Sequence, residues 1–166
     1  MGPLGYGLRP TNMAISTNED GSPADGHAAA LASLTGILSL EHELEASEIR
    51  ALSPVCLAYI GDAVFELYVR LAFLWPPRRI QTLHGEVTDQ VKAEQQAAYL
   101  QQLEPELRKA EREIVRRGRN GTTGRPRRVA AHIYRQATGF EALLGYLYIT
   151  DRTRLWELLS HLPIGS

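Results

Sequence analysis

The chain of 166 residues contains a single cysteine, Cys56, and this scarcity limits the kinds of protein it can be. One thiol cannot form a disulfide or a zinc-binding cysteine pair within the chain. The sequence also lacks the run of about 20 apolar residues that a membrane-spanning helix needs, and its start does not have the layout of a secretory signal. A chain with these absences suits a reducing compartment, and we expect a cytoplasmic protein with no membrane partner.

The net charge of −1 conceals an uneven distribution of charge along the chain. Residues 1–50 carry seven acids and two bases, whereas residues 108–135 carry ten bases and two acids. Positive charge concentrated in one segment of a nearly neutral chain favours binding to a polyanion.

The length is sufficient for one domain with a substantial core. Residues 1 to about 40 are rich in Gly, Pro, Ser, Asn and Ala, a composition typical of disordered tails. We therefore predict a flexible tail over residues 1–45 and one folded domain over residues 46–166. Within the tail, Leu31–Leu40 is either a short helix or part of the disordered segment.

The folded domain is predicted to be all-α, because it shows helical periodicity and no β-hairpin pattern or internal repeat. Ser53-Pro54 offers a capping side chain followed by proline at the first helical position, and Trp75-Pro76-Pro77 ends that helix. Glu104-Pro105-Glu106 places acids at the start of another helix. The five expected helices cover residues 54–74, 80–103, 104–116 or 117, 130–149 and 151–162. In the second of these, the expected inward positions include Val87, Val91, Ala98 and Leu103.

Two carboxylates, Asp62 and Glu141, lie almost alone inside apolar segments of two predicted helices. A carboxylate that is buried must be paired, protonated or bound to a cation, because stripping its hydration is costly. The small residues Gly61 and Gly145 would allow the two helix backbones to approach closely. If the helices cross there, Asp62 and Glu141 could share a Mg²⁺ ion, which favours carboxylate, water and phosphate ligands.

A bound Mg²⁺ can polarise a phosphate oxygen and generate a hydroxide nucleophile, so this pair of acids suggests phosphodiester hydrolysis. Glu66 follows Asp62 by four residues on the same helix face and is a further candidate ligand. The alternative is that Arg70 or Arg135 neutralises the two acids.

The segment from Gly118 to Arg128 contains several glycines and arginines and is predicted to be an exposed basic loop. Arginine offers forked donors to phosphate oxygens, and glycine lets a backbone come close to them. A phosphate-binding surface that ignores base sequence is the functional interpretation, and a solvated loop without a ligand is the alternative. The candidate nucleic-acid-binding residues of this region are Arg116, Arg117, Arg119, Asn120, Arg127 and Arg128.

Three blocks of the sequence resemble a known family. Tyr59–Val64 is similar to the signature helix of the ribonuclease III catalytic domain, and Phe140–Gly145 is similar to its second metal-binding segment. Together with Arg116–Asn120 and Tyr134-Arg135, residues of about 47–162 resemble Mini-ribonuclease III, the compact class without a double-stranded-RNA-binding domain. The resemblance implies the helical fold of the ribonuclease III endonuclease domain.

The resemblance also implies an activity and its partners. It implies a homodimeric, Mg²⁺-dependent endoribonuclease that cleaves double-stranded RNA, leaves 5′-phosphates and processes the 5′ and 3′ ends of precursor 23S ribosomal RNA. A ribosomal protein that presents the substrate is a candidate partner.

Individual residues take their expected roles from the same resemblance. Asp62 and Glu141 would be the catalytic metal ligands, with Glu66 or water completing the shell, because Ala58 and Thr138 stand where larger ribonuclease III enzymes have two further acids. Lys92 and Gln95 lie in a helix whose counterpart faces RNA. Tyr59 would lie at the dimer interface, with a core tyrosine as the alternative. Independently of the resemblance, Cys56 is expected in the core, and Trp75 and Trp156 are expected to serve packing.

Two other functions are compatible with these patterns. One is a non-catalytic RNA-binding or ribosome-associated protein on the same fold, and a scaffold of that kind would bind RNA without needing a divalent metal. The other is a helical protein-interaction module whose arginines meet an acidic partner.

Overall fold

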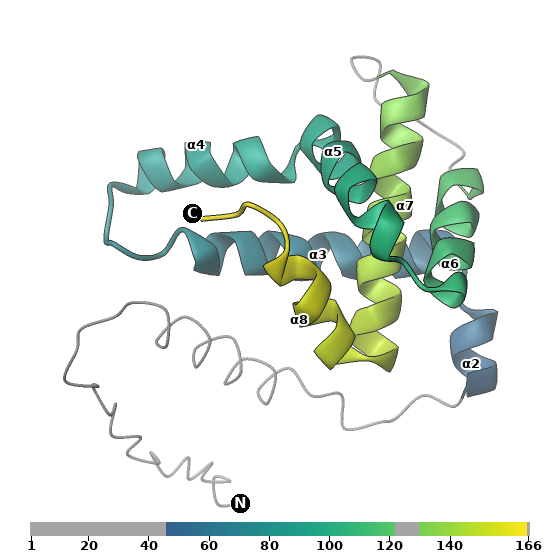
Figure 1. The fold of residues 1–166 in the computed structure, drawn as a ribbon. Coiled ribbons are helices and arrows are strands. Elements are labelled where there is room, and N and C mark those ends of the chain that lie inside the picture. The colour runs from purple at the N-terminus through teal and green to yellow at the C-terminus, as the bar shows by residue number, and fades with distance from the viewer. Residues whose placement is uncertain (1–45, 122–129, 166) are drawn as a thin grey trace, which may run out of the picture. The chain divides into compact units, whose positions relative to one another are not determined.

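The computed structural model of the protein describes residues 46–121 and 130–165. Within these ranges every regular element is a helix and no strand occurs, as Figure 1 shows. The predicted all-α fold class is therefore confirmed. The predicted tail over residues 1–45, with its alternative helix over 31–40, lies outside the described residues.

The helices follow one another with short connections. Their bounds are α2 (Ala46–Ala51), α3 (Pro54–Ala72), α4 (Ile80–Val91), α5 (Ala93–Leu103), the 3₁₀ helix η1 (Glu104–Glu106), α6 (Lys109–Asn120), α7 (Ala131–Thr150) and α8 (Arg152–Ser160).

Helix α3 begins where the capping pattern predicted. The backbone N–H of Cys56 donates to Ser53 Oγ at 3.1 Å, and Pro54 occupies the first turn, where its missing N–H costs no hydrogen bond. The helix ends at Ala72, two residues before the predicted end.

The predicted helix over residues 80–103 is two helices, because the chain turns at Lys92. Lys92 has φ −67° and ψ 150°, an extended conformation that ends α4 and begins α5. The turn leaves α5 alongside α7 (Figure 1), where it buries four side chains. These are Gln96, Tyr99, Leu100 and Leu103. The inward position predicted for Ala98 is wrong, since that residue is exposed.

Helix α6 continues through Gly118, Arg119 and Asn120, so the predicted loop does not begin at Gly118. A Cβ atom on Gly118 would lie 2.9 Å from the Cα of Gly139 on α7, which shows that the two helices touch at this point. Gly118 therefore allows α6 and α7 to pack closely. This contact outweighs the preference of glycine for loops. Residues 122–129 lie outside the described residues.

Helix α7 is the centre of the core and contacts α3, α5, α6 and α8 (Figure 1). The rings of Phe65 and Phe140 meet edge to face with centroids 5.0 Å apart, and Tyr99 lies edge-on to Phe65 at 6.0 Å. All three aromatic side chains are buried. The core thus joins α3, α5 and α7, the three helices that carry the candidate site.

A buried ion pair connects α6 to α8. Arg154 Nε donates to Glu111 Oε1 at 3.1 Å, and both side chains are buried. Arg154 also donates to the carbonyl oxygen of Glu106 at 2.9 Å, while Glu111 accepts from the backbone N–H of Arg108 at 2.7 Å. Because the two charges have several hydrogen-bond partners, the desolvation of each is offset.

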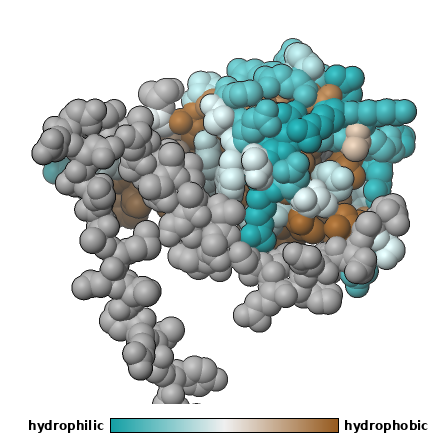
Figure 2. All heavy atoms as spheres, turned by 60° about the horizontal axis from the view of Figure 1, so that its bottom comes forward, coloured by the Kyte–Doolittle hydropathy of each residue, from teal (hydrophilic) through white to brown (hydrophobic). Residues whose placement is uncertain are grey.

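The described part of one face of the molecule is mainly polar (Figure 2). Figure 2 shows one face of the molecule, on which hydrophilic side chains cover most of the described surface and hydrophobic ones form smaller patches. No helix in the described ranges is long and apolar enough to cross a membrane.

Candidate active site

Helices α3 and α7 cross in direct backbone contact at two glycines. A Cβ atom on Gly61 would lie 1.8 Å from the carbonyl oxygen of Glu141, and one on Gly145 would lie 2.0 Å from that of Leu57. Real Cβ atoms do not approach other atoms so closely, so only glycine fits at either position. The predicted close crossing at Gly61 and Gly145 is therefore confirmed.

The crossing brings Asp62 and Glu141 into electrostatic contact, because Asp62 follows Gly61 and Glu141 lies one turn before Gly145. Asp62 is exposed and Glu141 is half-buried, so the expectation that both are buried is wrong for Asp62. The pair is open to a ligand from solvent.

Both acids are held in a less ionised state than usual. Burial, which is the larger cause, and the negative charge of Asp62 together raise the pKa of Glu141 to about 7, although the side-chain amide of Gln96 acts in the opposite direction. Loss of hydration also raises the pKa of Asp62, with the charge of Glu66 as a second cause. A bound cation would relieve this repulsion.

Gln96 is the one residue of this cluster that the sequence analysis missed. Its side chain is 2% exposed, and its amide is close enough to Asp62 and Glu141 to lower the pKa of both carboxyls. The signal was available, since a glutamine occupies the inward stripe of α5 that Tyr99, Leu100 and Leu103 otherwise fill.

Arginine does not neutralise the two acids in the described part of the chain. Arg70 pairs with Glu66 on the surface of α3, and Arg135 is exposed on α7. Within residues 46–121 and 130–165, the polar group that acts on the pKa of both acids is the neutral amide of Gln96.

The donor set fits a hard divalent cation that retains other ligands. Two carboxylates beside a neutral amide provide negative charge without a competing cation, the chemistry that Mg²⁺ prefers. Among residues 46–121 and 130–165, no three His, Cys, Asp or Glu side chains are grouped so as to hold a metal. Glu66 is thus not gathered with Asp62 and Glu141, so water or substrate oxygens would complete the shell.

The raised pKa of Glu141 predicts a pH-dependent penalty on folding. Its ordinary pKa is 4.5 and its folded value is about 7, so between these values the folded state binds more protons than the unfolded chain. Stability therefore falls as pH rises through this window and the penalty is constant above it. We expect Glu141→Gln to raise the free energy of unfolding of the metal-free protein by about 1–3 kcal/mol at pH 8 and to leave it nearly unchanged at pH 4.

Urea denaturation of the two proteins at both pH values measures this difference. An equal difference at pH 4 and pH 8 would show that Glu141 is not the titrating group. Adding Mg²⁺ at pH 8 should stabilise the unsubstituted protein more than Glu141→Gln.

The four predicted RNA-binding residues at the end of α6 have different surroundings. Arg116 is exposed and bonds to Glu113, with Nε donating at 2.8 Å, and Asn120 is exposed. Arg117 donates to the carbonyl oxygen of Leu52 at 3.2 Å. Arg119 pairs with Glu104. Arg116 and Asn120 are therefore presented to solvent, whereas Arg117 and Arg119 also hold α6 to neighbouring segments.

The other predicted RNA-binding residues lie elsewhere. Lys92 is exposed at the turn between α4 and α5 and pairs with Asp89 at 3.0 Å, while Gln95 is half-buried on α5. Arg127 and Arg128 lie outside the described residues.

The first half of α3 presents an apolar face to solvent. Tyr59 is 79% exposed and Val55 and Ile60 are also exposed, so the alternative that Tyr59 belongs to the core is excluded. Cys56 shares this exposed face, and its predicted core position is wrong. The predicted packing role of Trp75 is also wrong, since that side chain is exposed. Helix α3 is apolar on nearly every side, but the other described helices cover only part of it.

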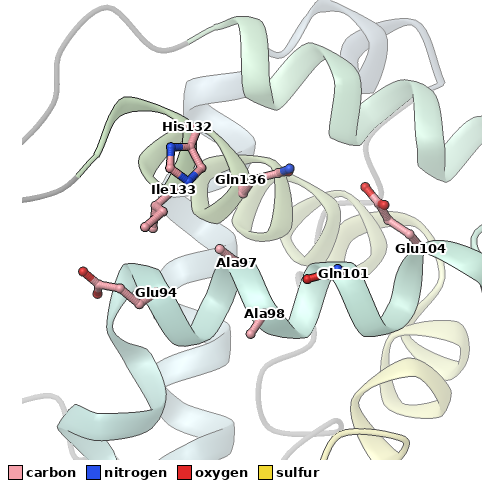
Figure 3. Close-up of a pocket in the computed structure, with 8 residues that line it drawn as sticks. All are labelled: Glu94, Ala97, Ala98, Gln101, Glu104, His132, Ile133 and Gln136. Carbon is pink, nitrogen blue, oxygen red and sulfur yellow. The ribbon is translucent and has the colours of Figure 1, made fainter.

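A hollow of about 420 Å³ lies between α5 and α7, apart from the two acids. Figure 3 shows Glu94 of α5 and Glu104 of η1 near the two ends of the hollow, with His132 and Gln136 of α7 above them. Neither Asp62 nor Glu141 lines this hollow.

Known proteins are similar to this chain in sequence and in fold. A family model described as the ribonuclease III domain matches residues 56–152. The chain is 55% identical over 116 residues to a Mini-ribonuclease 3 of Synechocystis sp., covering 70% of this chain and 81% of the relative. It is 43% identical over 121 residues to a Mini-ribonuclease 3 of Thermoanaerobacter sp., covering 70% and 84%.

A crystal structure of a protein from Fusobacterium nucleatum matches with a TM-score of 0.64 at 28% identity, over 68% of this chain and 93% of that one. The family match includes the whole of the helix crossing and both acids, since Gly61, Asp62, Glu141 and Gly145 all lie within residues 56–152. The resemblance found in the sequence is thus confirmed, and the chain belongs to the Mini-ribonuclease 3 family of ribonuclease III-domain endoribonucleases.

Proposed function

We propose that this endoribonuclease hydrolyses double-stranded RNA at Asp62 and Glu141 with Mg²⁺ as its metal, leaving 5′-phosphates, and that it processes the 5′ and 3′ ends of precursor 23S ribosomal RNA. The observation that carries the proposal is the pair of acids at the helix crossing, which has a neutral hydrogen-bond partner and a raised pKa. The names of the relatives support the reaction class and fit the ribosomal substrate.

Asp62 and Glu141 would hold the cation through their carboxylates. When bound, Mg²⁺ supplies a Lewis acid for a phosphate oxygen and lowers the pKa of a bound water. Glu141 must be ionised to act as a ligand, and its pKa of about 7 means that a proton leaves this side chain near neutral pH. The exposure of Asp62 leaves room for a phosphate group beside the pair.

The RNA backbone would meet the basic end of α6. Exposed Arg116 and Asn120 can donate to phosphate oxygens, and Arg127 and Arg128 would extend this surface. Lys92 and Gln95, at the start of α5, would provide further contacts to the RNA backbone. Contacts of this kind position a duplex without reading its sequence, so substrate choice would come from RNA shape or from a ribosomal protein that presents the stem.

The exposed face of α3 supports a homodimer. An exposed aromatic side chain among apolar neighbours is typical of an interface, and a two-fold axis would relate two sites to the two strands of a duplex. We expect Tyr59→Glu to give a monomer at concentrations where the unsubstituted protein is a dimer, as measured by sedimentation velocity.

Trp75→Glu is the matched control, because Trp75 is 72% exposed beyond the other end of α3. It should leave the dimer intact. A monomeric unsubstituted protein, or equal dissociation in both variants, would contradict an interface at Tyr59.

The proposed reaction is tested with purified protein and long double-stranded RNA, in Mg²⁺ or in excess chelator. Fragments that carry 5′-phosphates and form only with Mg²⁺ are the expected result. If the RNA stays intact in Mg²⁺, the assay is repeated with precursor 23S ribosomal RNA as the substrate and with ribosomal proteins added. Failure there, with metal-independent RNA binding, would identify a non-catalytic RNA-binding protein instead.

A further inference from the structure

We propose that Gln96 is a positioning residue of the metal site, which holds Asp62 and Glu141 in place for the cation through its side-chain amide. The inference rests on the proposed function and adds to it a residue outside the acidic pair. It is carried by the burial of Gln96 on α5, where that helix packs against α7, by the nearness of its amide to both acids and by its lack of charge.

The place of Gln96 is unusual for a glutamine. With 2% exposure it is as buried as the leucines beside it on α5, and a polar group is costly to bury unless it is hydrogen-bonded. Its amide is close enough to Asp62 of α3 and to Glu141 of α7 to lower the pKa of each carboxyl. One residue on a third helix therefore connects the acids of the other two.

The amide suits this task better than other side chains of similar size. Its nitrogen carries two N–H donors, and a carboxylate has several acceptor positions, so each acid can accept from Gln96 and keep lone pairs for a cation. A lysine or arginine there would compete with the metal for the negative charge. An apolar side chain would leave two repelling carboxylates without a fixed orientation.

The turn at Lys92 positions this amide. The backbone N–H of Gln96 donates to the carbonyl oxygen of Lys92 at 3.0 Å, in the first turn of α5. The turn at Lys92 therefore fixes the start of α5, the part of the helix that carries Gln96. The extended conformation of Lys92 therefore sets the direction in which Gln96 leaves the helix.

Gln96→Met tests the proposal, because methionine preserves the length of the side chain and removes both donors. Mn²⁺ binding to the protein without RNA is measured by electron paramagnetic resonance, and Mg²⁺ is titrated in the cleavage assay. We expect the Mn²⁺ Kd and the Mg²⁺ concentration for half-maximal cleavage each to rise roughly tenfold, as for the loss of a hydrogen bond to a charged group. The kcat at saturating Mg²⁺ should remain within roughly threefold, since the acids themselves are intact.

Gln102→Met is the matched control, the same substitution at an exposed position of α5, and should change neither quantity. Circular dichroism and thermal unfolding report whether Gln96→Met folds. If it does not, Gln96→Asn keeps the amide but withdraws it by one methylene, and the same weakening of metal binding is expected. A metal affinity equal to that of Gln102→Met, or a loss confined to thermal stability or kcat, would overturn the proposal.

Metal binding and RNA cleavage, measured separately, distinguish a failure of the proposed function from a failure of the role of Gln96. If the unsubstituted protein binds Mn²⁺ but cleaves no RNA, the proposed function fails, while weaker Mn²⁺ binding by Gln96→Met still supports the positioning role. If the protein cleaves RNA and Gln96→Met has the same metal dependence, the role of Gln96 fails alone. Absence of Mn²⁺ binding to the unsubstituted protein at millimolar metal, together with absence of Mg²⁺-dependent cleavage, would overturn both.

Discussion

Asp62→Asn and Glu141→Gln should each lower the rate of duplex RNA cleavage by a factor of roughly 10³ or more, because a catalytic metal supplies several kcal/mol of transition-state stabilisation. Each change replaces a carboxylate with an amide of nearly the same shape. The helix crossing depends on Gly61 and Gly145, so neither variant should disturb it. Duplex binding should survive, since phosphate contacts come from basic residues on other segments.

Single-turnover cleavage and equilibrium RNA binding, measured on the same preparations, separate the two effects. Glu106→Gln is the control, because it removes a surface acid that bonds to His161 on another part of the domain. Glu66→Gln decides the open question of a third ligand, since a comparable loss would add Glu66 to the metal site. Full activity in Asp62→Asn or Glu141→Gln would refute the assignment of the metal site.

Gly61→Ala and Gly145→Ala should each destabilise the fold by about 3 kcal/mol or more, beyond most single substitutions. The new methyl group would lie within 2.0 Å of a carbonyl oxygen in the facing helix. Both partners are backbone atoms of packed helices, so neither can move aside as the end of a side chain would. The clash can be relieved only if α3 and α7 move apart. That movement would loosen the core around Phe65 and Phe140.

Gly85→Ala is a matched control on a different helix. A Cβ atom at Gly85 meets nothing within 4 Å, so alanine should stabilise α4 by about 0.5–1 kcal/mol through its better helix propensity. Urea denaturation followed by circular dichroism measures all three variants. Similar free energies of unfolding for Gly61→Ala and Gly85→Ala would show that the helix contact is looser than described.

The parts of the fold that the sequence predicts are those with a local signal. Ser53 and Pro54 define the start of α3 because capping involves residues three apart. Gly61 and Gly145 predict the crossing because glycine inside an apolar helical segment has a cost that close packing compensates. The crossing in turn predicts that Asp62 and Glu141 lie close together, because each is within about one helical turn of a crossing glycine.

The parts that the sequence does not predict depend on distant contacts. Lys92 is neither glycine nor proline, and only the packing of α5 against α7 accounts for the turn there. Arg117 bonds to Leu52, which is 65 residues away, so its partner could not be inferred from neighbours. Gln96 likewise takes its role from two other helices.

Burial was the least predictable property. An all-round apolar helix suggests packing on every side, yet Cys56 and Tyr59 of α3 face solvent within a single chain. This mismatch between composition and exposure is what the proposed dimer would explain.

The ion pair between Glu111 and Arg154 limits how far the domain can be shortened. A truncation before α8 would remove Arg154, the buried guanidinium partner of Glu111 at the start of α6, and breaking a buried pair in this way typically costs about 3–5 kcal/mol. It would also strip Leu155, Leu158 and Leu159 from the core. Helix α8 is thus an integral part of the domain, and a minimal expressed version of the nuclease must extend through Leu162.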